Sequence, residues 1–450
     1  MMENSFRQEY EKKLVPADQA VKIIKSGDHI FYGEFAMFPE YLDEALSKRV
    51  EELTDIVIRG ISYTKVPKVV MSDLKREHVV LQDWHCGVVG RKLGDKQLAV
   101  YVPITYHQGP RVINKYDSVN VAMVMVGPMD ENGYFNLGPV NSVTPTYTDK
   151  TEILIVEVNN SVPHCLGGNG ESIHISHVDY IVEGNNAPLL QLPEVTPLET
   201  DYQIADYIME EMENGACLQL GIGGLPNVVG ARIAESDLQD LGFHSEMLVE
   251  SVVDMYQAGR LTGERKNIDK KKMAYTFALG TQRLYDFMDN NPVCASYPVN
   301  YVNDPRVIAL NDKVMAINSA IQVDLLSQVA SETSGMRQIS GTGGQFDFIF
   351  GAFNSHGGKG LICLSSTFKD KTGTVHSRIV PALSPGTVVT VPRSIVQYVV
   401  TEYGIVQLKG KSVWDRSEAL ISIAHPDFRD ELVKQAEDMK IWVRSNRLEP

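Results

Sequence analysis

The chain has 450 residues, 43% of them hydrophobic, and a formal net charge of −15. Because single hydrophobic cores stop growing at roughly 250–300 residues, this length predicts at least two domains of an ordinary globular protein. The negative net charge argues against a nucleic-acid partner, whose binding surface would need clustered Lys and Arg.

The N-terminal segment, MMENSFRQEYEKKLVPADQA, is polar and of mixed charge, unlike a secretory signal. No apolar run approaches the ~20 residues that span a bilayer. The five cysteines are scattered, odd in number and without a C-x-x-C pair, which is typical of reduced thiols in a reducing compartment. We therefore expect a cytoplasmic protein with no membrane partner.

Short apolar runs alternate with amphipathic segments along most of the chain. Runs of Val and Ile indicate strands buried on both faces, as in parallel sheets flanked by helices. The predicted fold class is α/β, with two related open α/β domains and mostly parallel sheets. Asp130–Gly133 predicts a tight turn into Tyr134–Leu137. The predicted helices are Ala17–Lys25 and Ile204–Met212, and the predicted strands are Ile56–Ile58, Val121–Val126, Ile153–Val158, Met315–Ile317 and Val388–Val391.

A faint internal repeat relates the two halves of the chain. Gly27 and Gly215 each end a helix-like segment, and each is followed by a short strand that a further glycine closes. A glycine at a helix end is common, so the similarity indicates either chance or two related halves. The stretch rich in Asn and Pro between residues 183 and 197 predicts a linker. It divides an N-terminal domain, residues 1–195, from a C-terminal domain, residues 196–450.

The segment Leu218–Asn227, LQLGIGGLPN, carries an apolar strand into a glycine-rich loop, and Pro226 suits the first turn of a following helix. Backbone N–H groups in such a loop converge on an anion or a developing oxyanion, although a purely structural turn would have the same pattern. It is not a dinucleotide-binding fingerprint, because Pro226 replaces the third glycine of G-x-G-x-x-G.

Glu246 lies in the segment HSEM, in a mostly apolar context between a strand-like segment and a helix-like segment that Gly259 ends. A carboxylate in this setting is either a structural cap or ion-pair partner, or a functional acid or nucleophile.

Two further segments carry residues suited to ligand contact. In Gly341-x-Gly343-Gly344 the glycines are too dense for a strand or helix interior, which indicates close backbone approach to another group. Asn318 follows a buried strand run, where its amide either orients a ligand or serves as a plain turn residue. The sequence contains no H-E-x-x-H and no G-x-S-x-G, and its histidines lack metal-ligand spacing, so no metal site is expected.

Taken together, these segments resemble the acetyl-CoA hydrolase/transferase family, and within it the 4-hydroxybutyrate and butyryl-CoA:acetate CoA-transferases. The resemblance covers essentially the whole chain and is carried by long motifs. These are AMVMVGPMDENGYF, IHISHVD, LQLGIGGLPN, HSEM, YTFALGTQRLYDF, AINSAIQVDLLSQ, SGTGGQFDFIFGA and VVTEYGIVQLKGKSVWDRSEALISIAHPDFRDEL.

The resemblance implies a role for each of these segments. Glu246 is the implied nucleophile, and the glycine loops are implied to contact the CoA thioester and to form the oxyanion hole. Asn318 matches the asparagine at the end of the family's strand, and Lys371 is placed for the anionic end of CoA. The chain reads Met247-Leu-Val-Glu-Ser251 where relatives read M-[ILF]-S-D-G, so the local acyl-pocket geometry is left open. The implied CoA-binding residues are Gly221, Ile222, Gly223, Gly224, Leu225, Asn318, Gly343, Gly344 and Lys371.

The implied reaction moves CoA between carboxylic acids through a glutamyl-CoA thioester on Glu246, with CoA as substrate and no separate cofactor. The expected partners are an acyl-CoA and short-chain acids, and the chain is expected to form a homo-oligomer. A butyryl-CoA:acetate CoA-transferase is the favoured hypothesis. The alternatives are a 4-hydroxybutyrate or propionate CoA-transferase, an acyl-CoA hydrolase, and a non-catalytic CoA-binding protein. The intact nucleophile and glycine loops argue against the last.

Overall fold

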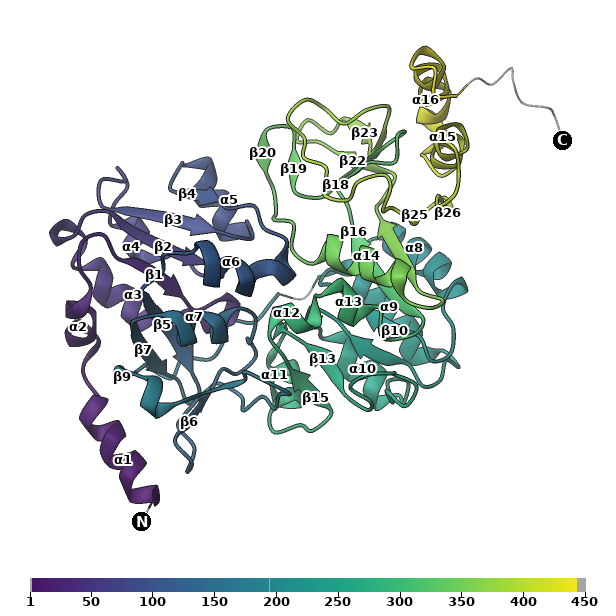
Figure 1. The fold of residues 1–450 in the computed structure, drawn as a ribbon. Helices are drawn as coiled ribbons and strands as arrows, with labels where there is room; N and C mark the ends of the chain where they lie inside the picture. The colour runs from purple at the N-terminus through teal and green to yellow at the C-terminus, as the bar shows by residue number, and fades with distance from the viewer. Residues whose placement is uncertain (1, 194, 443–450) are drawn as a thin grey trace. The chain divides into compact units, whose positions relative to one another are not determined.

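The computed structural model describes residues 2–193 and 195–442 (Figure 1). Contacts divide these residues into two compact units. The first unit comprises the described residues up to Pro193, together with Glu246–Leu248 and Lys272–Val302. The second unit comprises the other described residues.

A parallel sheet forms the centre of the first unit, and its first strand in chain order, β1, lies between other strands rather than at an edge. Its strand order is β4-β3-β2-β1-β5-β7-β9, and all neighbouring strands run parallel. This arrangement confirms the α/β fold class with a mostly parallel sheet. The strands are β1 (His29–Tyr32), β2 (Ile56–Gly60), β3 (Val79–Asp83), β4 (Ala99–Tyr101), β5 (Val121–Val126), β7 (Ile153–Val158) and β9 (Tyr180–Glu183).

Helices cover the two faces of this sheet because side chains alternate along each strand. Ile30 and Tyr32 belong to a core that also contains residues of α2 (Ala17–Ala20), α3 (Glu40–Ser47), α4 (Lys68–Met71) and α5 (Val88–Asp95). Phe31 points the other way and stacks on Tyr147 of α7 (Thr144–Lys150), with ring centroids 4.0 Å apart. All three strand residues are fully buried. The unbroken apolar run of β1 therefore reflects burial on both faces.

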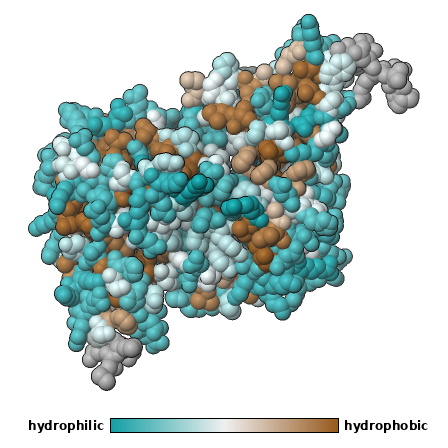
Figure 2. Space-filling view, in the orientation of Figure 1, coloured by the Kyte–Doolittle hydropathy of each residue, from teal (hydrophilic) through white to brown (hydrophobic). Residues whose placement is uncertain are grey.

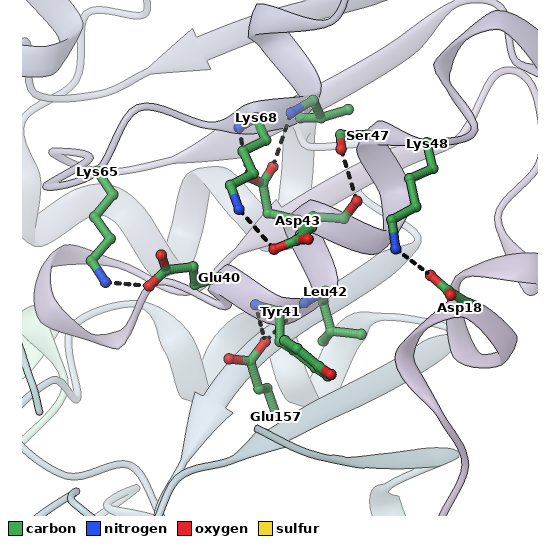
Figure 3. Close-up of polar contacts among 12 residues, drawn as sticks. Asp18, Glu40, Tyr41, Leu42, Asp43, Ser47, Lys48, Lys65, Lys68 and Glu157 are labelled. Atoms are coloured by element: carbon green, nitrogen blue, oxygen red, sulfur yellow. Dashed lines mark hydrogen bonds and ion pairs between the residues drawn. The ribbon is translucent and has the colours of Figure 1, made fainter. Parts of the chain in front are cut away.

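Buried carboxylates cap two of these helices, since a proline occupies each N-cap position and offers no side-chain hydrogen bond. Figure 3 shows Glu157 accepting from the backbone N–H groups of Tyr41 and Leu42, both at 2.9 Å, at the start of α3. Asp43 accepts from Lys68 N at 2.6 Å and from Val69 N at 3.3 Å at the start of α4. These two buried acids therefore have a structural role.

The second unit is built around strands that are neighbours in the order β11-β10-β16-β21-β25-β26. All of these pairs run parallel except β25 with β26, which is antiparallel. The strands are β10 (Cys217–Gln219), β11 (Gly242–His244), β16 (Val314–Ser319), β21 (Lys359–Cys363), β25 (Tyr398–Thr401) and β26 (Gly404–Gln407). The main helices are α8 (Glu199–Glu210), α9 (Gly224–Glu235), α10 (Ser251–Gln257), α14 (Gln345–Asn354), α15 (Val413–Ser422) and α16 (Pro426–Asp438).

The two units repeat one strand order. The order β2-β1-β5-β7-β9 in the first corresponds to β11-β10-β16-β21-β25 in the second. The glycines that precede the equivalent strands β1 and β10, Gly27 and Gly215, both have positive φ, at 85° and 78°. This agreement favours two related halves over chance as the origin of the sequence repeat.

Most predicted elements are confirmed, and one is wrong. Residues 388–391 form no strand, and only Val391 makes an isolated bridge, to Val329. The apolar run lies between Pro385-Gly386 and Pro392 and is too short to form a strand, and Pro392 has no backbone N–H to donate to a neighbouring strand. The strand in this part of the chain is β25. The turn at Asp130–Gly133 is confirmed, with Gly133 at φ 84°.

The visible face of the molecule is largely hydrophilic, with apolar patches between the polar regions (Figure 2). The N-terminal helix α1 (Met2–Lys13) carries an ion pair between Lys13 and Glu9 at 2.7 Å. Across residues 2–193 and 195–442, no helix combines the length and the apolar character needed to cross a membrane.

Candidate active site

Glu246 occupies a backbone position fixed by neighbouring strands of the first unit. It directly precedes β12 (Met247–Leu248), which runs parallel to β14 (Phe277–Ala278). The Glu246 carbonyl oxygen accepts from Thr276 N at 3.0 Å and from Phe277 N at 3.2 Å. Its side chain is half-buried. The sequence assigned this residue to the C-terminal domain, whereas these bonds group it with the first unit. A domain boundary near residue 195 stays a prediction.

A cluster of buried polar side chains lies in the same unit. The Ser142 hydroxyl hydrogen-bonds to the Glu34 carboxyl group and to the hydroxyl of Tyr106. The backbone N–H of Ser142 donates to both the carbonyl and the hydroxyl oxygen of Thr276, each at 3.1 Å. Thr276 N in turn donates to Glu246 O. Thr276 therefore holds both Ser142 and the backbone of the predicted nucleophile.

Burial sets the electrostatics of this cluster. It raises the pKa of the Glu34 carboxyl group to about 8, although the hydrogen bond with Ser142 opposes the shift. The pKa of Tyr106 lies well above its ordinary value, first because of burial and then because of the charges of Glu34 and Glu246. Glu34 is therefore mostly neutral near neutral pH, and Tyr106 keeps its proton.

In the second unit, the first glycine loop connects β10 to α9, as the sequence predicted. Gly223 precedes α9 with φ 125° and ψ −177°, a conformation available essentially to glycine alone. Ile222 is 50% exposed, whereas Leu225 is buried in the first turn of the helix. Pro226 also lies in that turn, which confirms its predicted position.

Asn318 and the second glycine loop lie at the end of the adjacent strand, β16. The Asn318 side-chain amide donates to Gln219 Oε1 of β10 at 2.8 Å. Gly343 has φ 52°, and Gly344 is the N-cap of α14. Gln345 Nε2 donates to Ser319 O at 2.7 Å and ties the start of α14 to β16. Because β10 and β16 are parallel neighbours, the structure brings the two loops and Asn318 to one edge of the sheet.

Lys371 lies apart from these loops. It occupies the turn of the hairpin formed by β22 (Thr367–Lys369) and β23 (Val375–Ser377). Asp370 shapes this turn by accepting from Thr372 N at 2.8 Å and from Thr374 N at 3.0 Å. The Lys371 side chain is exposed. No hydrogen bond between described residues joins it to either glycine loop, so its role in binding stays a prediction.

The departure from the usual motif after Glu246 falls at the start of α10. Val249 and Ser251 are buried. A Cβ on Gly230 of α9 would stand 2.3 Å from Ser251 Cβ, so the two helices meet closely at this point. Val249-Glu250-Ser251 therefore belongs in part to the packing of α10 on α9.

The cysteines are unsuited to nucleophilic catalysis. All five are buried and free of disulfides. Burial raises the pKa of Cys217 to about 11 and that of Cys294 to about 12. A thiol needs a lowered pKa to act as a nucleophile. Within the described ranges, no three or more His, Cys, Asp or Glu side chains are grouped so as to hold a metal ion.

Sequence reasoning missed Glu34, Ser142, Tyr106 and Thr276. They are separated by between 36 and 134 residues in the pairs that touch. Two local signals exist: Thr276 lies in the motif YTFALGTQRLYDF, and Glu34 is a charged residue directly after the segment HIFYG. Their grouping becomes visible only in the folded unit.

Comparison with known proteins identifies the family. Residues 1–193 match the acetyl-CoA hydrolase/transferase N-terminal domain, and residues 280–436 match its C-terminal domain. The chain is 49% identical to butyryl-CoA:acetate CoA-transferase of Anaerostipes caccae, covering 98% of this chain and 100% of that protein. It is 38% identical to 4-hydroxybutyrate coenzyme A transferase of Clostridium kluyveri, covering 95% and 97%.

Among solved structures, the chain resembles RipA from Yersinia pestis, with a TM-score of 0.89 and 36% identity over 97% of this chain and 99% of that one. The likeness therefore extends over both units and both glycine loops. The chain belongs to the acetyl-CoA hydrolase/transferase family.

Proposed function

We propose that this enzyme transfers coenzyme A from butyryl-CoA to acetate through a covalent thioester on Glu246. The Anaerostipes caccae and Clostridium kluyveri relatives are CoA-transferases, and each matches this chain over nearly its whole length. This chain is an enzyme of the same class. The higher identity, 49% against 38%, favours the butyryl substrate over 4-hydroxybutyryl. The observation that carries the mechanism is the half-buried Glu246 side chain on a backbone held by Thr276 and Phe277.

The proposed chemistry has two half-reactions and needs no net proton transfer. A Glu246 carboxylate oxygen attacks the acyl carbonyl, a C–O bond forms, the C–S bond breaks, and the electron pair leaves on the CoA thiolate. The thiolate then attacks the glutamyl carbonyl of the mixed anhydride, and butyrate departs as the C–O bond breaks. Acetate reverses both steps and leaves as acetyl-CoA. The thioester energy is conserved, and Glu246 ends as the free carboxylate.

The glycine loops, Asn318 and Lys371 would make the proposed contacts to CoA. Backbone N–H groups of Gly221–Leu225 and of Gly343 and Gly344 would donate to the thioester oxygen. Asn318, fixed by its bond to Gln219, would orient the bound thioester. Lys371, exposed at its hairpin turn, would approach the phosphates. Each oxyanion donor is worth about 2.7–4 kcal/mol of transition-state stabilisation in measured cases.

The competing functions differ in what the reaction consumes. A hydrolase forms free CoA without an acceptor acid, whereas a transferase depends on one. A 4-hydroxybutyrate or propionate transferase differs only in the acyl group, and one methylene is worth about 1–3 kcal/mol of discrimination.

Initial rates with butyryl-, propionyl- and 4-hydroxybutyryl-CoA, each with and without acetate, test the proposal. We expect the highest kcat/KM with butyryl-CoA, strict dependence on acetate, and parallel double-reciprocal lines, because the first acid leaves before the second binds. Release of CoA at the same rate without acetate would identify a hydrolase instead. A higher kcat/KM with either other substrate would reassign the acyl group.

A further inference from the structure

Three buried side chains from distant segments form a hydrogen-bonded row in the first unit. Glu34 follows β1, Ser142 precedes α7, and Tyr106 begins a short 3₁₀ helix, Tyr106–Gln108. Their exposed fractions are 1%, 0% and 4%. Ser142 lies in the middle, bonded to Glu34 on one side and to Tyr106 on the other. Ser142 gives each of its neighbours a hydrogen-bond partner, which offsets part of the cost of burying three polar groups.

The row is coupled to Glu246 in two ways. Thr276 accepts from Ser142 N and donates to Glu246 O, so one residue fixes both backbones. The charge of Glu246 is also among the influences that raise the pKa of Tyr106, after burial and the charge of Glu34. Hydrogen bonds through Thr276 therefore tie the row to the backbone of Glu246, whose charge the proposed reaction consumes in one step and regenerates in another.

Counting protons shows that the row has two orientations. When Glu34 is neutral, its hydroxyl can donate to Ser142, so that Ser142 donates to Tyr106 and the Tyr106 proton is available to another acceptor. When Glu34 is ionised it only accepts, so Ser142 donates to it and Tyr106 donates to Ser142. An ionised Glu34 therefore excludes the orientation in which the Tyr106 proton points away from the row, and a neutral Glu34 allows it.

We propose that Tyr106 is a positioning residue for CoA transfer, and that Glu34 and Ser142 direct its hydroxyl proton toward the Glu246 carboxyl group. This inference rests on the proposed function, in which Glu246 carries the CoA. A donor at this place orients the attacking carboxylate and stabilises the glutamyl oxygen when the thiolate attacks.

The surroundings of Glu34 favour its neutral form near neutral pH, which allows the outward orientation of the Tyr106 proton. Burial is the largest influence and raises the Glu34 pKa to about 8. The charge of Glu34 acts on three buried tyrosines, which stay neutral in this range. These tyrosines are Tyr63, Tyr106 and Tyr147. The charges of Asp43, Asp83 and Arg59 also act on Tyr63. The charges of Asp117 and Arg59 also act on Tyr147.

The test compares Tyr106→Phe with Tyr147→Phe and Glu34→Gln. Tyr147 is a matched control, since it is equally buried and its hydroxyl donates to Asp117 at 2.7 Å rather than to the row. We expect Tyr106→Phe to lower kcat about 100-fold, in the range seen when one transition-state donor is removed. KM should change far less, and Tyr147→Phe should keep the wild-type kcat.

The pH profile supplies a readout that a purely structural role would not move. In the wild type, kcat should decline as pH rises through about 8, where Glu34 ionises and the row reverses. A glutamine at position 34 donates to Ser142 at every pH, so Glu34→Gln should lose this alkaline decline. Persistence of the same decline in Glu34→Gln would overturn the inference, even if Tyr106→Phe did not fold.

Mass spectrometry of the glutamyl-CoA adduct separates this inference from the proposed function. A wild-type adduct on Glu246, together with unchanged kcat in folded Tyr106→Phe, would overturn the role of Tyr106 alone. Absence of any wild-type adduct on Glu246 would overturn both. We expect the CoA adduct on Glu246 in both proteins, and we expect it to form about 100-fold more slowly in Tyr106→Phe than in the wild type.

Discussion

The Ser245 hydroxyl holds the backbone of Leu220 by two hydrogen bonds, donating to its carbonyl oxygen at 3.0 Å and accepting from its N–H at 3.3 Å. Ser245 is fully buried. It directly precedes Glu246, and Leu220 directly precedes the first glycine loop. The serine of HSEM therefore fixes the end of β10 at the point where the chain enters that loop.

Ser245→Ala should destabilise the protein and lower its activity together. Removing the hydroxyl leaves two buried backbone groups without this partner, which costs about 1–3 kcal/mol. Urea denaturation and kcat measurements check this expectation. Ser236→Ala is the matched control, because Ser236 also bonds a carbonyl, Ile233 O at 2.8 Å, and an N–H, Leu238 N at 3.2 Å, but is only half-buried. Equal losses in both variants would contradict a special role for Ser245.

Gly223→Ala should lower the free energy of unfolding by about 1–3 kcal/mol, because φ 125° is strained for any residue with a Cβ. Gly221→Ala, two residues earlier, should cost much less in stability. Gly221 has no positive φ, and a Cβ there meets no atom within 4 Å. Chemical denaturation of the two variants measures the difference. Equal stability of the two variants would show that the loop does not adopt this conformation.

Glu34→Gln should also change how stability depends on pH. The folded-state pKa of Glu34 is raised from 4.5 to about 8 by burial. Its stabilising contribution is therefore fully present below 4.5 and is lost as pH rises through about 8. Between about pH 5 and pH 9, wild-type stability should fall relative to Glu34→Gln. Urea denaturation at both values measures this, and a constant difference between the proteins would refute the raised pKa.

Glu246→Asp should lose transferase activity and retain or gain slow hydrolysis. The shorter side chain withdraws the carboxylate by one methylene, and positioning errors of about 1 Å can cost ~100-fold in rate. It also leaves space in which a water molecule can reach the thioester. Assays for acetyl-CoA formation and for free CoA distinguish the two reactions. Full transferase activity in the variant would contradict the positioning argument.

Much of the fold could be predicted because its signals are local. The runs Val121–Val126 and Ile153–Val158 are strands β5 and β7 with the bounds read from the sequence. The glycine loops were also visible, since Gly223 and Gly343 need conformations that few other residues adopt. Val388–Val391 failed because apolar content alone does not show that the neighbouring prolines limit a strand to one bridge.

The remainder of the site depends on long-range contacts that no single segment encodes. Ser142 meets Glu34 across 108 residues and Thr276 across 134. Glu246 was found through its motif, but its association with the first unit follows from its bonds to Thr276 and Phe277. Such pairings are set by how strands assemble, which residue spacing does not reveal.

Incubation with butyryl-CoA alone, without an acceptor acid, tests the covalent role of Glu246 most directly. Trypsin releases the segment 233–260 as one peptide, and fragmentation distinguishes Glu246 from the other acidic residues in it. Glu246→Gln is the control, paired with intact-mass measurement because deamidation would restore the wild-type residue. We expect a CoA adduct on Glu246 in the wild type and none in Glu246→Gln. An adduct on a different residue, or none at all, would contradict the account.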